Sequence, residues 1–292
     1  MVPPRALAAF LASCALAAAP AAAQQGDDSI VVTGQAERPS ADAVAAQARA
    51  ITRADPALRD VPLALVQDRL CPGVIGMTVE SAVPIIDRIR ATAQELGVPL
   101  ADDAQCRANL VLVIVADGAQ ELAALHRSSP QLFETLTPPE RRDLLASPGP
   151  ARAWHVTSMR SRDGFRIPQA ESLDRPPATT MWSAHSKIYL AVRQDIDTSF
   201  VLLDSAAVKG KTLVQLADYA TMRGLARTRP PEDAAGLDTI LSLFASQGTP
   251  PQGLTQFDRS YLAALYNSPA NVPGMQKLLG VNRELRRVDA GE

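Results

Sequence analysis

Residues 110–115 are Leu110-Val111-Leu112-Val113-Ile114-Val115, an unbroken apolar run rich in β-branched side chains. Such a run is typical of a β-strand buried on both faces, because no position offers solvent a polar side chain. We therefore expect a sheet with this strand in its interior and the neighbouring segments packed around it.

The segment before this run predicts a helix that ends at Gly97, because glycine commonly terminates helices. Pro84 is expected in the first turn of that helix, so Ser81 is a better N-cap than Thr78. The apolar face of the helix recurs at helical spacing; its members are Ile85, Ile86, Ile89, Ala93 and Leu96.

A first strand is expected from residues 63–70 and 74–77, around Cys71-Pro72-Gly73. Strand, helix and strand then form a right-handed crossover if the two strands are parallel. Cys71 and Cys106 lie at the end of the first strand and just before the second, which favours a disulfide in an oxidising compartment. The alternative, a metal-binding pair, lacks histidine or further cysteine nearby.

The remainder predicts a single α+β domain with a mixed β-sheet, a strand-helix-strand start and a helical C-terminal part. Thr137 and Glu140 form a capping box. A loop is expected at 163–177 and a turn at 194–199. The expected strands are 154–160, 187–193 and 200–204, and the expected helices are 119–127, 139–146, 212–226, 237–244, 255–266 and 275–279.

The N-terminus predicts export. Arg5 precedes the apolar run 6–19, and Ala21-Ala22-Ala23 is a cleavage pattern. We expect removal of residues 1–23 near Ala23 and a periplasmic or secreted mature protein. Two alternatives remain, lipidation at Cys14 and retention as a membrane anchor, although the run is shorter than the ~20 residues of a span.

Residues 24–60 predict a disordered tether, because they carry few large apolar groups; a short helix at 41–50 interrupts it. The segment Ile30-Val31-Val32-Thr33-Gly34 resembles the TonB box of outer-membrane receptors. The resemblance implies a contact in which this segment pairs with the edge of TonB's sheet. A stray apolar patch is the alternative. The globular domain is expected at 61–292.

Charge excludes some function classes. The chain of 292 residues has a formal net charge of −2, and loss of residues 1–23 removes one arginine and no acidic residue. A protein so close to neutral has no strong field to attract nucleic acid or an anionic membrane.

The C-terminal part contains Leu254-Thr255-Gln256-Phe257-Asp258-Arg259, followed by Leu262, Leu265-Tyr266 and Pro273-Gly274-Met275. This pattern resembles an uncharacterised bacterial family of secreted zincin-like proteins with an LTxFDRxxLxxLY…PGM tail. Thr255 and Asp258 also form a local N-cap and first-turn acid. The resemblance implies a zincin-like fold with its active-site helix before this tail.

In zincins that helix carries HExxHxxG, whose two histidines bind zinc while the glutamate acts as general base. The family resembled here more often has Glu-Glu-x-x-Gln. With Gly224 as the anchor, this chain has Ala217, Asp218 and Thr221 instead. Ala217 cannot bind a metal and Thr221 is a poor ligand, so we expect neither zinc nor another cofactor.

No other constellation replaces that site. The histidines at 126, 155 and 185 have no helical ligand spacing. We therefore expect a non-catalytic protein that binds an unknown protein or peptide in a groove beside Asp218, Tyr219 and the strand 187–193. The alternatives are a hydrolase or peptidase with a rearranged site, using His185 and Asp218 with His155 as a further candidate, and a TonB-associated envelope accessory.

Overall fold

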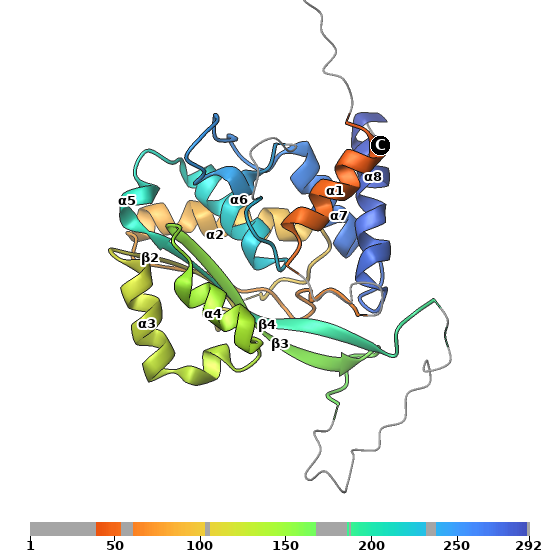
Figure 1. The fold of residues 1–292 in the computed structure, drawn as a ribbon, viewed down its shortest axis with the longest axis horizontal. Helices are drawn as coiled ribbons and strands as arrows, with labels where there is room; N and C mark the ends of the chain where they lie inside the picture. The colour runs from red at the N-terminus through yellow and green to blue at the C-terminus, as the bar shows by residue number, and fades with distance from the viewer. Residues whose placement is uncertain are drawn as a thin grey trace, which may run out of the picture. The chain divides into compact units, whose positions relative to one another are not determined.

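The computed structural model describes residues 39–53, 61–102, 106–167, 186, 188–231 and 238–290. Its centre is a four-stranded mixed sheet of order β1-β2-β4-β3 (Figure 1). The strands are β1 (Pro72–Ile75), β2 (Leu110–Val115), β3 (Ala151–Ser161) and β4 (Val192–Asp204). β1, β2 and β4 are parallel, whereas β3 runs antiparallel to β4 at the edge.

Helices cover both faces of the sheet. One face packs against α2 (Val79–Glu95) and α6 (Leu213–Gly224), and the other packs against α3 (Gly118–Ser128), η1 (Pro130–Phe133) and α4 (Pro138–Ala146). Each strand contributes side chains to the cores on both faces of the sheet, because successive side chains point to opposite faces. Thus Leu110 and Leu112 enter the larger core, whereas Val113 and Val115 pack against the smaller core around Trp154.

The C-terminal helices complete the larger core. α7 (Gln256–Tyr266) packs against α8 (Gly274–Ala290), and α1 (Ala41–Ile51) packs against α8. The short helices are α5 (Ser205–Val208) and η2 (Ile240–Ser242). The buried Lys277 donates to the carbonyls of Leu265 and Ser268, which satisfies acceptors at the end of α7.

Several sequence predictions are confirmed. The α+β class, the mixed sheet and the parallel crossover β1-α2-β2 are present. The strand at 110–115 has the predicted bounds, and Thr137 with Glu140 forms the predicted capping box. Gly97 follows the end of α2 with φ +72°, which glycine adopts without a steric penalty.

The predicted turn at 194–199 is wrong, because β4 runs through it without interruption. The turn was predicted because this stretch is rich in polar residues. Asp195 is 1% exposed and forms ion pairs with Arg160 and Arg193, so a buried carboxylate is compensated within the sheet. Leu65 adds two backbone hydrogen bonds on the opposite side of this stretch.

Two helix ends also differ from prediction. α2 begins after Thr78, not after Ser81, and Pro84 lies inside it. The proline removes the hydrogen bond to the carbonyl of Glu80, which is exposed, so water can replace the missing donor. Of the helix expected at 237–244, the described residues contain only η2, and α8 extends well beyond the expected end at 279.

The tether predicted for residues 24–60 is too long. α1 lies within it, yet Val44, Ala48 and Ile51 are fully buried, and contacts group residues 39–292 into one compact unit. The predicted signal peptide and the segment 30–34 lie outside the described residues. No helix in the described ranges is long and apolar enough to cross a membrane.

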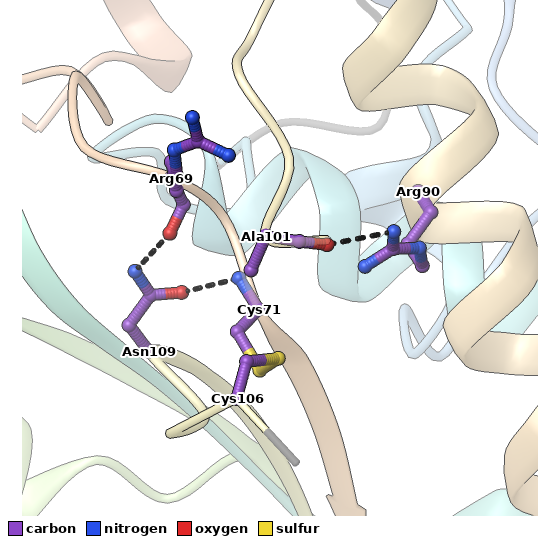
Figure 2. Close-up of a disulfide and its surroundings, with 6 residues drawn as sticks. All are labelled: Arg69, Cys71, Arg90, Ala101, Cys106 and Asn109. Atoms are coloured by element: carbon purple, nitrogen blue, oxygen red, sulfur yellow. Dashed lines mark hydrogen bonds between the residues drawn. A yellow bond between two sulfur atoms is a disulfide. The ribbon is translucent and has the colours of Figure 1, made fainter. Parts of the chain in front are cut away.

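A disulfide joins Cys71 and Cys106, with 6.1 Å between the two Cα atoms (Figure 2). Asn109 supports this end of the crossover: its side-chain oxygen accepts from the Cys71 amide at 2.8 Å, and its side-chain nitrogen donates to the Arg69 carbonyl at 3.0 Å. The bridge therefore fastens the start of β1 to the segment that leads into β2.

Replacing both cysteines by serine should lower the free energy of unfolding by about 3–4 kcal/mol, because the bridge closes a loop of 35 residues in the unfolded chain. Urea unfolding of the mature protein measures this. A reductant should destabilise the wild type similarly and leave the double variant unchanged. Equal stability of wild type and variant under oxidising conditions would contradict the expectation.

Candidate functional site

α6 is the helix on which the sequence places the candidate site. A capping box between Thr212 and Gln215 starts it. Near its end, a Cβ on Gly224 would come within 2.5 Å of the Leu110 side chain, so glycine permits close packing on β2. The Ser199 hydroxyl donates to the Gly224 carbonyl at 2.6 Å, which fixes this end of α6 to β4.

Asp218 is fully buried and held by three donors. Arg88 of α2 donates from Nε at 2.8 Å and from Nη2 at 3.0 Å, and the Leu254 amide donates at 2.7 Å. The carboxylate therefore joins α6 to α2 and to the segment before α7. This hydrogen bonding raises the pKa of Arg88. Asp218 is placed as a structural anchor and not as an accessible binding group.

The residues at the other zincin positions do not fit a metal. Ala217 carries no donor atom, and the Thr221 hydroxyl donates to the Ala217 carbonyl at 2.8 Å. Within the described ranges, no group of three His, Cys, Asp or Glu side chains is arranged to hold a metal ion. The chemistry of the donors on α6 therefore disagrees with the zinc site of zincins.

A cavity of about 660 Å³ lies on a different face of α6. Tyr219 and Arg223, spaced by four residues, contribute from that helix. The start of β3, the end of α4 and the segment 238–250 form its other walls. Tyr219, one of the two predicted binding residues, therefore lines this cavity, and Asp218 does not.

The cavity is rich in arginine. Among the described residues, four arginines line it, namely Arg53, Arg152, Arg223 and Arg229, against the two aspartates Asp143 and Asp238. Arg152 is already paired, with Asp204 at 3.2 Å. Burial, and then the neighbouring charge of Arg223, lower the pKa of Arg53. The cavity is thus an environment in which a further cation is unfavourable and an anion is favourable.

The edge of β3 opens onto the same cavity through Ala151 and Ala153. Alternate residues of an antiparallel strand direct both backbone groups away from their partner strand. His155 has this orientation, because its carbonyl accepts from the Thr135 hydroxyl, and Ala151 and Ala153 share its register. In the described part of the chain, nothing hydrogen-bonds to the outer side of these two alanines.

Asp258, a residue of the C-terminal pattern that begins at Leu254, helps to position the segment 238–250 that forms the cavity wall opposite β3. The buried carboxylate of Asp258 accepts from the Thr239 hydroxyl at 2.6 Å, the Ile240 amide at 2.7 Å and the Thr255 amide at 3.0 Å. Burial raises the pKa of Asp258 while these hydrogen bonds oppose the rise. Thr255 is therefore the N-cap of α7 and Asp258 its first-turn acid, as predicted, and Asp258 also fixes the start of the segment 238–250.

The histidine candidates are not brought together with Asp218 by any described contact. His155 is buried, lies outside the lining of the cavity, and its Nε2 hydrogen-bonds to the Arg223 carbonyl at 2.8 Å. Burial, with the nearby charge of Arg227, lowers the pKa of His155 to about 3, so its ring is neutral. His185 and Lys187 lie outside the described residues.

Sequence reasoning missed Arg223 and the edge at Ala151 and Ala153. It expected the strand edge of the groove at 187–193, whereas β4 begins at Val192 and is an interior strand. The spacing of Tyr219 and Arg223 was a usable indication, since both fall on one face of the predicted helix. The open edge depends on strand order, which local patterns do not specify.

No family model, no curated protein and no solved structure matches this chain. The likeness to zincin-like proteins therefore rests on the residues of the tail.

Replacing Asp218 by alanine should lower the free energy of unfolding by about 2–3 kcal/mol, because it removes the charge-assisted hydrogen bonds to Arg88 and leaves the Leu254 amide without its acceptor, while Arg88, 35% exposed, regains water. Urea unfolding provides the measurement. Glu95→Ala is the control, since it breaks an exposed ion pair with Arg259 at 3.4 Å and should cost less than about 1 kcal/mol. Equal effects of the two variants would contradict an anchoring role for Asp218.

Acid should destabilise the protein partly through His155. Its folded pKa of about 3 lies below its unfolded value of 6.5, so only the unfolded state binds a proton between these values and stability falls as the pH falls through that window. Between pH 6.5 and 4.5 this should cost about 2–3 kcal/mol. His155→Gln, measured by urea unfolding at both pH values, should lose that much less than the wild type. An identical acid loss in the two proteins would show that His155 titrates normally.

Proposed function

We propose that the protein is an exported, non-catalytic, zincin-like protein that binds an extended peptide segment in the cavity between α6 and β3. The observation that carries the proposal is the open edge of β3 at Ala151 and Ala153, which lies inside a cavity of about 660 Å³. A cavity of this size is in the range of small-ligand sites.

An unpaired strand edge recognises an extended peptide through main-chain hydrogen bonds. Ala151, which is partly exposed, offers one amide donor and one carbonyl acceptor on the cavity side, and Ala153, only 3% exposed, lies deeper along the same edge. Phe244 of the opposite wall, which is only partly buried, adds apolar surface for the side chains of such a peptide.

The absence of catalysis in this proposal is supported by how the candidate groups are used. Asp218 stands at the position of the zincin general base, but its carboxylate already accepts hydrogen bonds from the Arg88 side chain and the Leu254 amide. His155 is neutral and hydrogen-bonded to a backbone carbonyl. The alternative of a rearranged hydrolase would therefore need residues outside this pair.

Export is supported by the N-terminal sequence and by the disulfide, which is typical of oxidising compartments. A contact with TonB through residues 30–34 stays a prediction from sequence.

Binding of N-acetylated pentapeptides composed of Val, Thr and Ala, measured by calorimetry, tests the proposal. Ala151→Pro removes an outward amide at the first residue of an edge strand, where proline is compatible with the sheet. We expect affinity to fall about tenfold or more, because a hydrogen bond is lost and the ring obstructs the peptide.

Met159→Pro is the matched control. It removes an outward amide from the same strand, but outside this cavity, so peptide affinity should stay within about twofold of the wild type. Near-UV circular dichroism verifies the fold of both variants. Equal binding by wild type and Ala151→Pro, or binding by neither, would refute the peptide groove.

A further inference from the structure

Arg223 has an unusual environment for a buried arginine. Its side chain lines the cavity and is only 4% exposed, yet it forms no ion pair with any described residue. Nη1 donates to the Tyr219 hydroxyl at 3.2 Å, and the guanidinium lies 5.8 Å from the centre of the Tyr219 ring. These contacts orient the guanidinium without neutralising its charge.

The other edge of this guanidinium has no partner among the described residues. Nε is buried without a hydrogen-bond acceptor, and Nη2 makes no hydrogen bond to any residue that the structure describes. Nε and Nη2 form the fork that binds a carboxylate through two parallel hydrogen bonds. Arg88 uses this same edge to hold Asp218, at 2.8 and 3.0 Å.

An uncompensated charge in the protein interior is costly, since burial removes its hydration. The neighbouring arginine Arg53 adds to that cost, because its charge and that of Arg223 repel each other. An anion that entered the cavity would relieve both penalties, and it would meet a donor already held in place by Tyr219.

We propose that Arg223, oriented by Tyr219, binds a carboxylate of the peptide that occupies this cavity. The inference rests on the proposed peptide groove and specifies its ligand as an acidic peptide. The edge of β3 then holds the backbone of the peptide, and the fork of Arg223 holds its negative end, either the C-terminal carboxylate or an acidic side chain.

Three matched peptides test this assignment by calorimetry: N-acetyl-Thr-Val-Thr-Val-Ala as the free acid, its C-terminal amide, and an amide with Asp in place of the final Ala. Hydrogen bonds to a charged group favour binding by about 1.5–3 kcal/mol, or about 10- to 100-fold. We expect the free acid or the Asp peptide to bind tighter than the neutral amide by that factor.

Arg223→Gln should abolish this preference while the neutral amide still binds. Tyr219→Phe removes only the orienting hydroxyl and should reduce the preference several-fold, which gives a second readout if Arg223→Gln is poorly folded. Arg259→Gln is the control, because it makes the same charge change on α7, outside the cavity; it should leave the preference intact.

The outcomes separate the two proposals. Equal binding of all three peptides by the wild type would overturn the carboxylate site and leave the peptide groove in place. A preference that persists in both Arg223→Gln and Tyr219→Phe would also overturn it. Failure of every peptide to bind the wild type would reject the groove together with the carboxylate site.

Discussion

The buried carboxylate of Asp218 is the interaction on which the arrangement around α6 depends. It connects three segments far apart in sequence, since its partners are Arg88 of α2 and the amide of Leu254 before α7. Gly253 fits beside it because a Cβ there would come within 2.6 Å of the carboxylate oxygen. A buried ion pair of this kind fixes relative positions, because separation of the partners would leave a charge without compensation.

A second buried carboxylate, Asp258, continues this organisation. It holds the start of the segment 238–250 through Thr239 and Ile240, while Asp218 holds Leu254, four residues beyond the end of that segment. The chain that forms this wall of the cavity is therefore held at its start and just beyond its end by acidic side chains that are inaccessible to solvent. The carboxylates of Asp218 and Asp258 are thus used to hold the fold together.

The elements predicted well were those whose patterns are local. The apolar run at 110–115, the capping box at Thr137 and the glycine stop at 97 each depend on neighbouring residues alone. The errors arose where distant residues decide. The polar stretch at 194–199 continues as a strand in which Arg160, on the neighbouring strand, and Arg193 compensate the buried Asp195.

The candidate site shows the same division. The sequence identified α6 and Tyr219, but it assigned a binding role to Asp218, whose partner Arg88 lies 130 positions away. Arg223 lines a cavity because the end of α4, the edge of β3 and the segment 238–250 surround it in the fold. The spacing of residues in the sequence does not predict which distant segments surround Arg223.

The open edge of β3 is short, and this has a consequence for the solubility of the protein. Pro150 precedes it, with its carbonyl bonded to the Asp204 amide, and beyond it the Thr135 hydroxyl bridges the His155 carbonyl and the Thr157 amide. A long unpaired edge invites sheet-to-sheet aggregation between copies of a chain. The Thr135 side chain blocks the continuation of that edge. Only a short segment can therefore pair with it, and a second copy of the whole strand cannot extend the sheet along its full length.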